Sequence, residues 1–280
     1  MTQQVSIDTN SRRRVDGVGR ILAVASGKGG VGKSTIAVSL ALTLHAKGHR
    51  VAILDADVYG PNVPLLLGIR RRASVDARQA MVPLASVASS SERPEPVVRY
   101  GLTVFSLAFL VGEDQDILPG NASLAGMLIR QLLFDTVWGK QDYLILDLPP
   151  GTGEPQATLV SQVELDGIVL VATSQSTALL DTLRSYHMFR HADVPIIGRI
   201  ENMSYLLCPH CGESIDMPSS EDFVDSPIAA VPLLGRLPFD LSVGHATNSG
   251  RPVVLTDEGS ATSRAFDQIA NRVDAFFVVE

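Results

Sequence analysis

Short apolar runs alternate with stretches of helical periodicity along most of this chain. The apolar runs end in glycine or polar residues, which is typical of the buried strands of a parallel sheet. Between most of them, apolar residues recur at helical spacing, which predicts helices. The predicted strands are Arg20–Ser26, Val51–Asp55, Leu102–Leu107, Tyr143–Asp147, Gly167–Thr173, Pro195–Glu201 and Val231–Gly235. The predicted helices are Ser34–Ala46, Leu124–Trp138, Pro155–Gln162, Thr177–Arg190 and Ser260–Phe276. This order predicts an α/β fold: a doubly wound, mostly parallel sheet with helices on both faces.

Two stretches depart from the alternation. Residues 1–19 are polar and lack the apolar core of a signal peptide, so we expect a disordered N-terminal arm. Residues 70–97 open on Arg70–Arg72 and become rich in Ser, Pro and Glu, which predicts an exposed insertion with little regular structure. Because the alternation otherwise continues to the C-terminus, residues 20–280 are expected to form a single domain.

Composition narrows the functional classes. The 280 residues are 45% hydrophobic and 19% charged, which is enough apolar material for a large core. The formal net charge of −7 disfavours a non-specific nucleic-acid binder, which normally carries a basic surface. No apolar stretch approaches the ~20 residues that span a bilayer. We therefore expect a cytoplasmic protein with neither a nucleic acid nor a membrane as its partner.

Residues 27–35 read Gly-Lys-Gly-Gly-Val-Gly-Lys-Ser-Thr and join a predicted strand to a predicted helix, the context of a phosphate-binding loop. Glycines let the backbone approach a triphosphate, and the helix N-terminus directs free N–H groups at anionic oxygens. Lys33 is expected at the β- and γ-phosphates of ATP, and the Ser34 hydroxyl on Mg²⁺. Lys28 has no role in this scheme. The loop residues predicted to bind the nucleotide are Gly27, Lys28, Gly29, Gly30, Val31, Gly32, Lys33, Ser34 and Thr35.

Carboxylates follow two other predicted strands. Asp57 lies just past a strand end and is predicted to reach the γ-phosphate, where it orients water or holds the Mg²⁺ shell. The alternative is that Asp57, and to a greater degree Asp55 at the strand end, caps the following turn. A second apolar strand ends in Asp147, which is predicted to hold Mg²⁺. The loop 148–153 after it, Leu-Pro-Pro-Gly-Thr-Gly, is suited to contact the γ-phosphate and to change conformation on hydrolysis.

Two residues on the same edge are candidates for binding the base. Asn202 follows the strand predicted to end at Glu201, and its amide is suited to pair with the adenine edge. Pro238 follows the last predicted strand and is suited to flank the ring. A purely structural role in a loop is the alternative for each.

The only two cysteines, Cys208 and Cys211, stand in Cys-Pro-His-Cys. In a reducing compartment such a pair binds metal or performs redox chemistry more often than it forms a structural disulfide. A thioredoxin-like dithiol would require a helix to start at the pair, whereas Gly212 follows with no clear helix. His210 is expected to be a loop residue rather than a ligand.

Together these motifs resemble those of a known family. Residues 27–35 are similar to the deviant Walker A loop of the MinD/ParA/nitrogenase-iron-protein group of P-loop NTPases. With the segments 55–61, 147–153, 202–205 and 208–212, the chain resembles the Mrp/ApbC iron–sulfur cluster carriers over roughly residues 20–275. It departs from that family's pattern where Leu-Pro-Gly-Asn at 118–121 replaces a Trp-Arg-Gly-Pro stretch, which leaves the contacts with partners open.

The resemblance implies a homodimeric ATP hydrolase with its two ATP sites facing each other. Lys28 matches the lysine that crosses the interface to the partner's phosphates, so the implied catalytic residues are Lys28, Lys33 and Asp57. Cys208 and Cys211 of two subunits would supply the four thiolates that a [4Fe–4S] cluster usually requires. The cluster would be received from a scaffold and delivered to apo iron–sulfur proteins.

The sequence leaves open another metal at the cysteines and, with it, another function. The same four thiolates would also suit a tetrahedral zinc site at the interface. The chain would then be a positioning or partitioning ATPase switch like MinD or ParA. A membrane-bound version of that switch should end in a basic amphipathic helix. The segment Thr262–Glu280 is amphipathic but carries little positive charge at its end.

Overall fold

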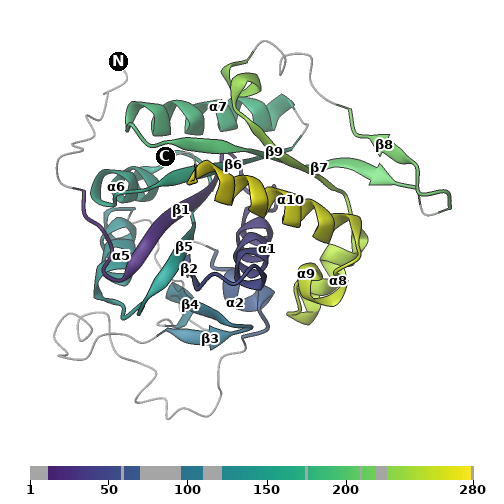
Figure 1. Cartoon of the computed structure of the whole chain (residues 1–280). Coiled ribbons are helices and arrows are strands. Elements are labelled where there is room, and N and C mark those ends of the chain that lie inside the picture. Colours follow the sequence, from purple (N-terminus) through teal and green to yellow (C-terminus); the bar gives the residue numbers. More distant parts are fainter. Residues whose placement is uncertain are drawn as a thin grey trace.

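The computed structural model describes residues 12–57, 60–69, 96–109, 122–173, 176–208, 210–218 and 226–278. Within them, a nine-stranded sheet runs in the order β3-β4-β2-β5-β1-β6-β7-β8, and β9 also pairs with β7 (Figure 1). The strands are β1 Val18–Ser26, β2 Val51–Asp55, β3 Val97–Arg99, β4 Leu102–Ser106, β5 Gln141–Asp147, β6 Gly167–Thr173, β7 Ile196–Leu207, β8 Ser214–Asp216 and β9 Leu233–Pro238. The helices are α1 Lys33–Ala46, α2 Val63–Leu66, α5 Ala122–Asp135, α6 Glu154–Gln162, α7 Ser176–His191, α8 Leu241–Ser249, α9 Val253–Thr256 and α10 Ala261–Phe276, with 3₁₀ turns at Leu107–Phe109 and Pro227–Ala230.

The sheet is parallel through its centre. The central strand β1 pairs in parallel with β5 and β6, and parallel pairs continue outward to β4 and β9. Two short strands, β3 and β8, are antiparallel to their neighbours. In this register Asp55 lies opposite Asp147, and Val24 of β1 lies opposite Asp147 from the other side. The predicted fold class is confirmed, and the phosphate loop and both carboxylate strand ends share one edge.

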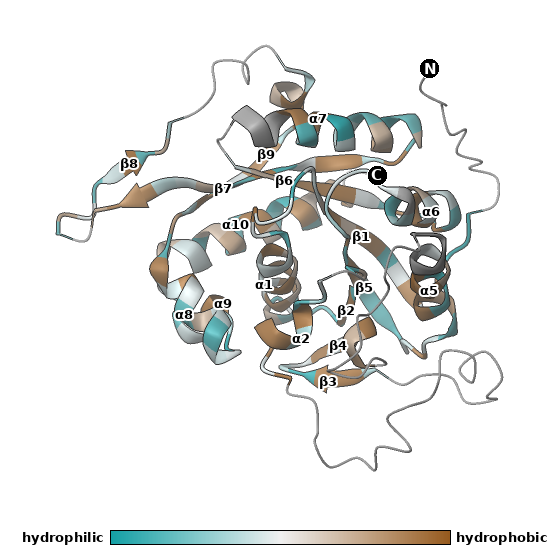
Figure 2. Ribbon diagram, turned by 180° about the vertical axis from the view of Figure 1, so that it is seen from behind, coloured by the Kyte–Doolittle hydropathy of each residue, from teal (hydrophilic) through white to brown (hydrophobic). Residues whose placement is uncertain are grey.

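Two apolar layers hold helices on the two faces of the sheet. Alternate residues of β1 point to opposite faces, with Leu22 and Val24 in the layer that includes α1 and α10. Ile21 and Ala23 belong to the other layer, which includes α5, α6 and α7. Hydrophobic colour accordingly concentrates on the central strands and on α1 (Figure 2). The helices α1 and α10 correspond closely to the predicted ones.

Two predicted strand boundaries are wrong, and both matter for the site. The strand predicted to end at Glu201 continues as β7 to Leu207, and the strand predicted over 231–235 is β9, which runs to Pro238. Beyond Glu201 the β7 side chains are less buried, so the apolar run stops although backbone pairing continues. The short elements β3, β8, α2 and α9 were not predicted, because so few residues carry no readable periodicity. Helix α8 was also missed.

Part of the N-terminal arm is ordered, which corrects the prediction for residues 12–19. The backbone of Arg13 bonds to Gln162 and Glu164 at the end of α6, and the Arg12 guanidinium bonds to the carbonyl of Val160. Val15 is only 3% exposed, and β1 begins at Val18. The rest of the predicted arm, 1–11, and most of the predicted insertion, 70–95, lie outside the described residues. Within the described residues, no helix is both long enough and apolar enough to cross a membrane.

Candidate nucleotide site and cysteine hairpin

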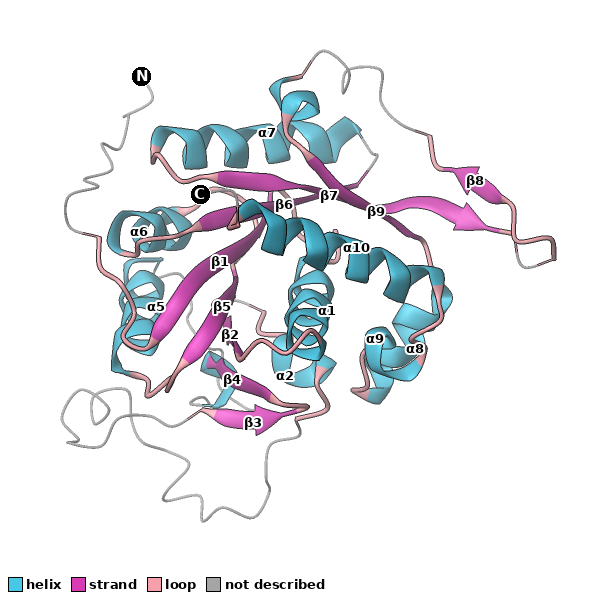
Figure 3. Ribbon diagram, in the orientation of Figure 1, coloured by secondary structure: helices cyan, strands magenta, loops and turns pink. Residues whose placement is uncertain are grey.

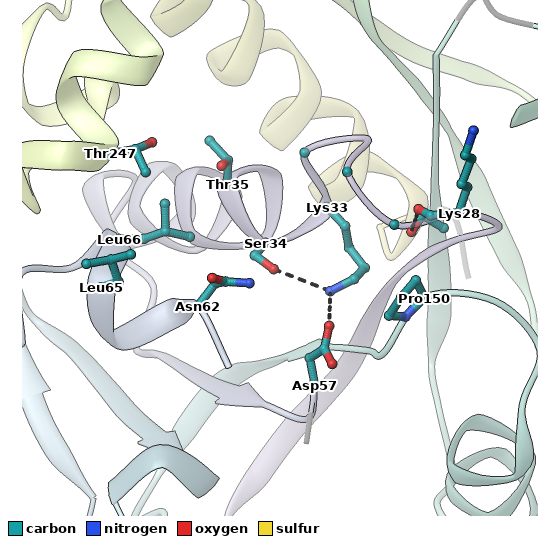
Figure 4. Close-up of a pocket in the computed structure, with 14 residues that line it drawn as sticks. Lys28, Lys33, Ser34, Thr35, Asp57, Asn62, Leu65, Leu66, Pro150 and Thr247 are labelled. Atoms are coloured by element: carbon teal, nitrogen blue, oxygen red, sulfur yellow. Dashed lines mark hydrogen bonds and ion pairs between the residues drawn. The ribbon is translucent and has the colours of Figure 1, made fainter. Parts of the chain in front are cut away.

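The loop between β1 and α1 borders a cavity of about 270 Å³ at the carboxyl edge of the sheet (Figure 4). Gly30 and Gly32 have φ angles of 81° and 87°, a region that side chains rarely adopt, so the loop's turn requires glycine there. Helix α1 starts at Lys33 directly after this turn. The residues that line the cavity are Ser26, Lys28, Gly29, Gly30, Gly32, Lys33, Ser34, Thr35, Asp57, Asn62, Leu65, Leu66, Pro150 and Thr247.

Lys33 is the centre around which the predicted catalytic and metal-binding groups gather. Its side chain is 6% exposed, and its Nζ lies 2.6 Å from Oδ1 of Asp147. The same Nζ lies 4.0 Å from Oδ2 of Asp57 and 3.4 Å from Oγ of Ser34. The side chains of Lys33, Asp57 and Ser34 point toward one another in Figure 4. The structure thus brings together four residues from three chain segments that the sequence placed at one site.

One carboxylate oxygen of Asp147 is available to bind a metal ion. Its side chain is fully buried, and its Oδ2 has no hydrogen-bond partner among the described residues. A buried carboxylate oxygen normally has a partner, and hard cations such as Mg²⁺ prefer such oxygens. The donor set of Asp147 Oδ2 and Ser34 Oγ therefore fits a magnesium ion held beside a phosphate chain.

Asp55 has a structural role, the alternative that the sequence favoured more for Asp55 than for Asp57. Its Oδ2 accepts bonds from the N–H of Val63 at the start of α2, at 3.0 Å, and from Ser106 Oγ at 3.2 Å. Its Oδ1 accepts the N–H of Asp57 at 3.2 Å. Burial, followed by the neighbouring Asp147 carboxylate, raises the pKa of Asp55 well above its usual range. Asp55 thus fixes the backbone on which Asp57 reaches the cavity.

Two loop residues predicted to bind nucleotide lie outside the cavity lining. A Cβ on Gly27 would lie 2.0 Å from the backbone carbon of Asp181, so glycine here allows α7 to pack against the loop. Val31 is 5% exposed and belongs to the core. Lys28, by contrast, is exposed, and its side chain points away from Lys33 and Asp57 (Figure 4).

A second cavity of about 250 Å³ adjoins the first across Gly32 and Thr35, and it is mostly apolar. Asn202 and Pro238, the two residues predicted to bind the base, both line it. The Asn202 amide donates to the carbonyl of Val31 at 2.8 Å, which ties β7 to the phosphate loop. The remaining lining residues are Ile36, Met203, Leu237, Phe239, Asp240, Leu241, Val243, Gly244, Val253, Thr262 and Phe266.

Several lining residues were missed by sequence reasoning. Asn62, Leu65 and Leu66 come from α2 and the turn before it, a helix too short to show a pattern. Thr247 comes from α8, whose two boundaries are recognisable in the sequence. Asp240 caps its first turn, accepting the Ser242 N–H at 2.8 Å, and Gly250 ends it in the left-handed conformation. Asp before and Gly after a segment are recognised helix boundaries.

The two cysteines lie between the end of β7 at Leu207 and the start of β8 at Ser214. These two strands form a hairpin that projects from the body of the molecule (Figure 3). Strand β7 leads to Cys208, and β8 returns antiparallel to it. The turn is closed by a bond from the Cys208 N–H to the Glu213 carbonyl at 2.9 Å. Cys208 is half-buried and Cys211 is exposed. The backbone N–H groups of Cys211 and His210, and then the Cys211 thiol, lower the pKa of the Cys208 thiol, which favours the thiolate that binds metal.

Comparison with known proteins identifies relatives along nearly the whole chain. The family model described as ParA, a NUBPL iron-transfer P-loop NTPase, matches residues 17–274. An iron–sulfur cluster carrier protein of Pyrococcus abyssi is 40% identical over 260 residues, which cover 90% of this chain and 84% of its own. The iron–sulfur cluster transfer protein NUBPL of Dictyostelium discoideum is 36% identical, covering 92% of this chain and 77% of its own.

Solved structures agree on the fold. A nucleotide-binding protein of Archaeoglobus fulgidus, solved in complex with ADP, superimposes with a TM-score of 0.65 at 31% identity, covering 87% of this chain and 90% of its own. The septum site-determining protein MinD of Pyrococcus horikoshii, solved with Mg-ADP, gives a TM-score of 0.68 at 23% identity, covering 93% and 98%. The second likeness supports the fold alone.

Proposed function

This chain belongs to the ParA/NUBPL family of iron-transfer P-loop NTPases, and on that basis we propose that it is an ATP-hydrolysing carrier of iron–sulfur clusters. Its fold is that of a nucleotide-hydrolysing P-loop protein. The observation that carries the proposal is the pairing of this site with a hairpin that presents two cysteines at its tip. The cluster is cargo, received from a scaffold and passed to apo iron–sulfur proteins, and the proposed location is the cytoplasm.

The geometry supports specific roles for the residues of the ATP site. Lys33 is placed to bind the β- and γ-phosphates once its contact with Asp147 is exchanged for phosphate oxygens. Asp57 lines the same cavity and is placed to orient the attacking water. Mg²⁺, held by Ser34 and Asp147, would neutralise phosphate charge. Asn202 and Pro238 border the adjoining apolar cavity, which suits an adenine ring.

We propose that ATP hydrolysis takes place in a homodimer of this chain. Lys28 is exposed and points away from the catalytic groups of its own chain, which suits a residue that acts on the nucleotide of a second copy. Two-fold symmetry presents the same patch on both subunits, so each lysine would complete the other site. The same symmetry would turn two cysteines into the four thiolates of a [4Fe–4S] site.

Anaerobic reconstitution with iron and sulfide tests the carrier. We expect about four irons per dimer and the EPR or Mössbauer spectrum of a [4Fe–4S] cluster. Cys208→Ser should lose the iron and keep ATP binding, because the hairpin tip lies outside both cavities. Stoichiometric zinc without iron uptake would contradict the carrier and favour a positioning ATPase with a structural zinc site.

We also propose that ATP turnover is coupled to cluster transfer through β7. The strand contacts the phosphate loop through Asn202 and reaches Cys208 six residues later. We expect ATP to change the rate at which loaded protein transfers its cluster to an apo-ferredoxin. Asn202→Ala should reduce that effect while the iron content stays unchanged. An ATP effect of full size in this variant would argue against the route through β7.

A further inference from the structure

The cysteine hairpin has little support of its own. In the described part of the hairpin, its two strands pair at three positions, from Tyr205 opposite Asp216 to Leu207 opposite Ser214, with one further backbone bond beyond each end. A two-stranded hairpin is marginally stable in water, so a fixed direction must come from contacts at its base. The base lies where β7 leaves the sheet, beside the end of β9 (Figure 3).

One side chain on β9 contacts both strands of the hairpin. The Nη2 of Arg236 donates to the carbonyl of Ser204 at 3.1 Å and lies 2.5 Å from Oδ1 of Asp216 on β8. Its Nε lies 3.7 Å from Oε2 of Glu201. The guanidinium also lies 5.5 Å from the centre of the Tyr205 ring. A planar group with five donors in fixed directions can hold several acceptors in one geometry, which an ammonium cannot.

These charges form a row that runs from the buried body to the exposed arm. Arg199 and Glu201, with side chains 10% and 21% exposed, pair at 3.1 Å. Glu201 then faces Arg236, which is 41% exposed, and Arg236 faces Asp216, which is 70% exposed. Because Arg199 orients the Glu201 carboxylate, and Glu201 in turn faces Arg236, the position of Arg236 is set by contacts with the body of the protein.

The base of the hairpin also borders the candidate adenine cavity. Tyr205 pairs with Pro238, and its carbonyl accepts the Phe239 N–H at 2.7 Å. Both Pro238 and Phe239 line that cavity. Arg236 lies two residues before Pro238 on the same strand, β9, so the strand that carries it ends at this cavity.

We propose that Arg236 is a positioning residue that sets the direction of the cysteine hairpin relative to the ATPase body. It thereby holds Cys208 and Cys211 where the cysteines of a second copy can meet them. The role in cluster binding rests on the proposed carrier function, whereas the orientation of the hairpin does not. An exposed ion pair adds little to global stability, so Arg236 acts on the orientation of the arm and hardly on the free energy of unfolding.

The two cysteines allow a direct test on the apo-protein. In Cys208→Ser, Cys211 is the only thiol of the chain, and a nitroxide attached to it reports the motion of the hairpin by EPR. We expect Arg236→Ala to make this spectrum clearly more mobile. The matched control is Arg50→Ala, which removes an exposed arginine paired with Asp142, also at 2.5 Å, at the amino ends of β2 and β5. An unchanged spectrum in Arg236→Ala would overturn the proposal.

Cluster retention gives the second readout, with both cysteines intact. We expect Arg236→Ala to release iron to a chelator about tenfold faster than the wild type, as when a contact that orients a metal ligand is lost. Arg236→Lys, which keeps the charge without the planar fork, should be intermediate and replaces the alanine variant if that fails to fold. Retention equal to the wild type would contradict the role in cluster binding. Failure of the wild type to take up iron would refute the carrier function alone, because the nitroxide spectrum still decides the role of Arg236.

Discussion

Lys33 is a buried cation whose charge is balanced by the carboxylates of Asp57 and Asp147. Both carboxylates are also candidates for contacts with ATP or its Mg²⁺. Asp147 is fully buried and has no access to water that could solvate its charge. Removing one member of a buried pair leaves the other uncompensated, which costs several kcal/mol. The charge of Lys33 is thus balanced by two carboxylates to which we assign proposed roles in binding and hydrolysing ATP.

Lys33→Ala should abolish ATP turnover and lower the free energy of unfolding by about 3 kcal/mol. Phosphate release and urea denaturation measure the two effects. Lys28→Ala is the control for stability, since the exposed Lys28 should change it by less than about 0.5 kcal/mol. Equal stabilities of the two variants would show that the Lys33–Asp147 pair is not a significant stabilising contact.

Among the elements, β7 shows where reading the sequence succeeds and where it fails. Its first half was predicted because most of its residues are apolar and buried, although Arg199 and Glu201 are charged. Its second half was missed because pairing there continues on a more exposed arm. Asn202 was therefore expected after the strand, whereas it lies within it, beside Met203 at a φ of 53° and a break in the pairing with β9.

Helix α10 is joined to the central strand β5 by the side chain of Tyr143. The Tyr143 hydroxyl donates to Oδ1 of Asp274 at 2.7 Å and accepts from Arg20 at 2.8 Å. Burial, and then the bond to Asp274, raises the pKa of Tyr143 to about 12. An unfolded tyrosine has a pKa of about 10, so the unfolded chain loses this proton first as the pH rises. The contribution of the hydroxyl is thus fully present below pH ~10 and is lost as the pH rises through the folded-state pKa.

Tyr143→Phe should therefore remove a pH-dependent part of the stability. Between pH 10 and 12, the free energy of unfolding of the wild type should fall by about 2 kcal/mol more than that of the variant. Denaturation at a series of pH values measures the difference between the two proteins, in which the titration of the lysines cancels. Parallel curves for the two proteins would contradict the raised pKa.

At the scale of the whole molecule, the exposed Lys28 allows a test of the proposal that each active site is built from two chains. Chains with Lys28→Ala and chains with Lys33→Ala should each be inactive alone. In a mixed dimer, the site with an intact Lys33 receives an intact Lys28 from the other chain. After equal mixing, half of the dimers are mixed with one working site each, so turnover should recover to about a quarter of the wild type. No recovery, with exchange of subunits verified, would exclude a Lys28 that acts across the interface.

The sequence by itself determined the alternation of strands and helices along the chain, the phosphate loop, and the two strands that end in a carboxylate. Each of these is a local pattern with a local physical cause. It also identified the cysteine pair. Only the tertiary structure decided that Gly27 serves the packing of α7, that Asp55 supports Asp57, and that Arg236 contacts both strands of the cysteine hairpin. These contacts join residues on different elements, and no periodicity along the chain records which elements meet.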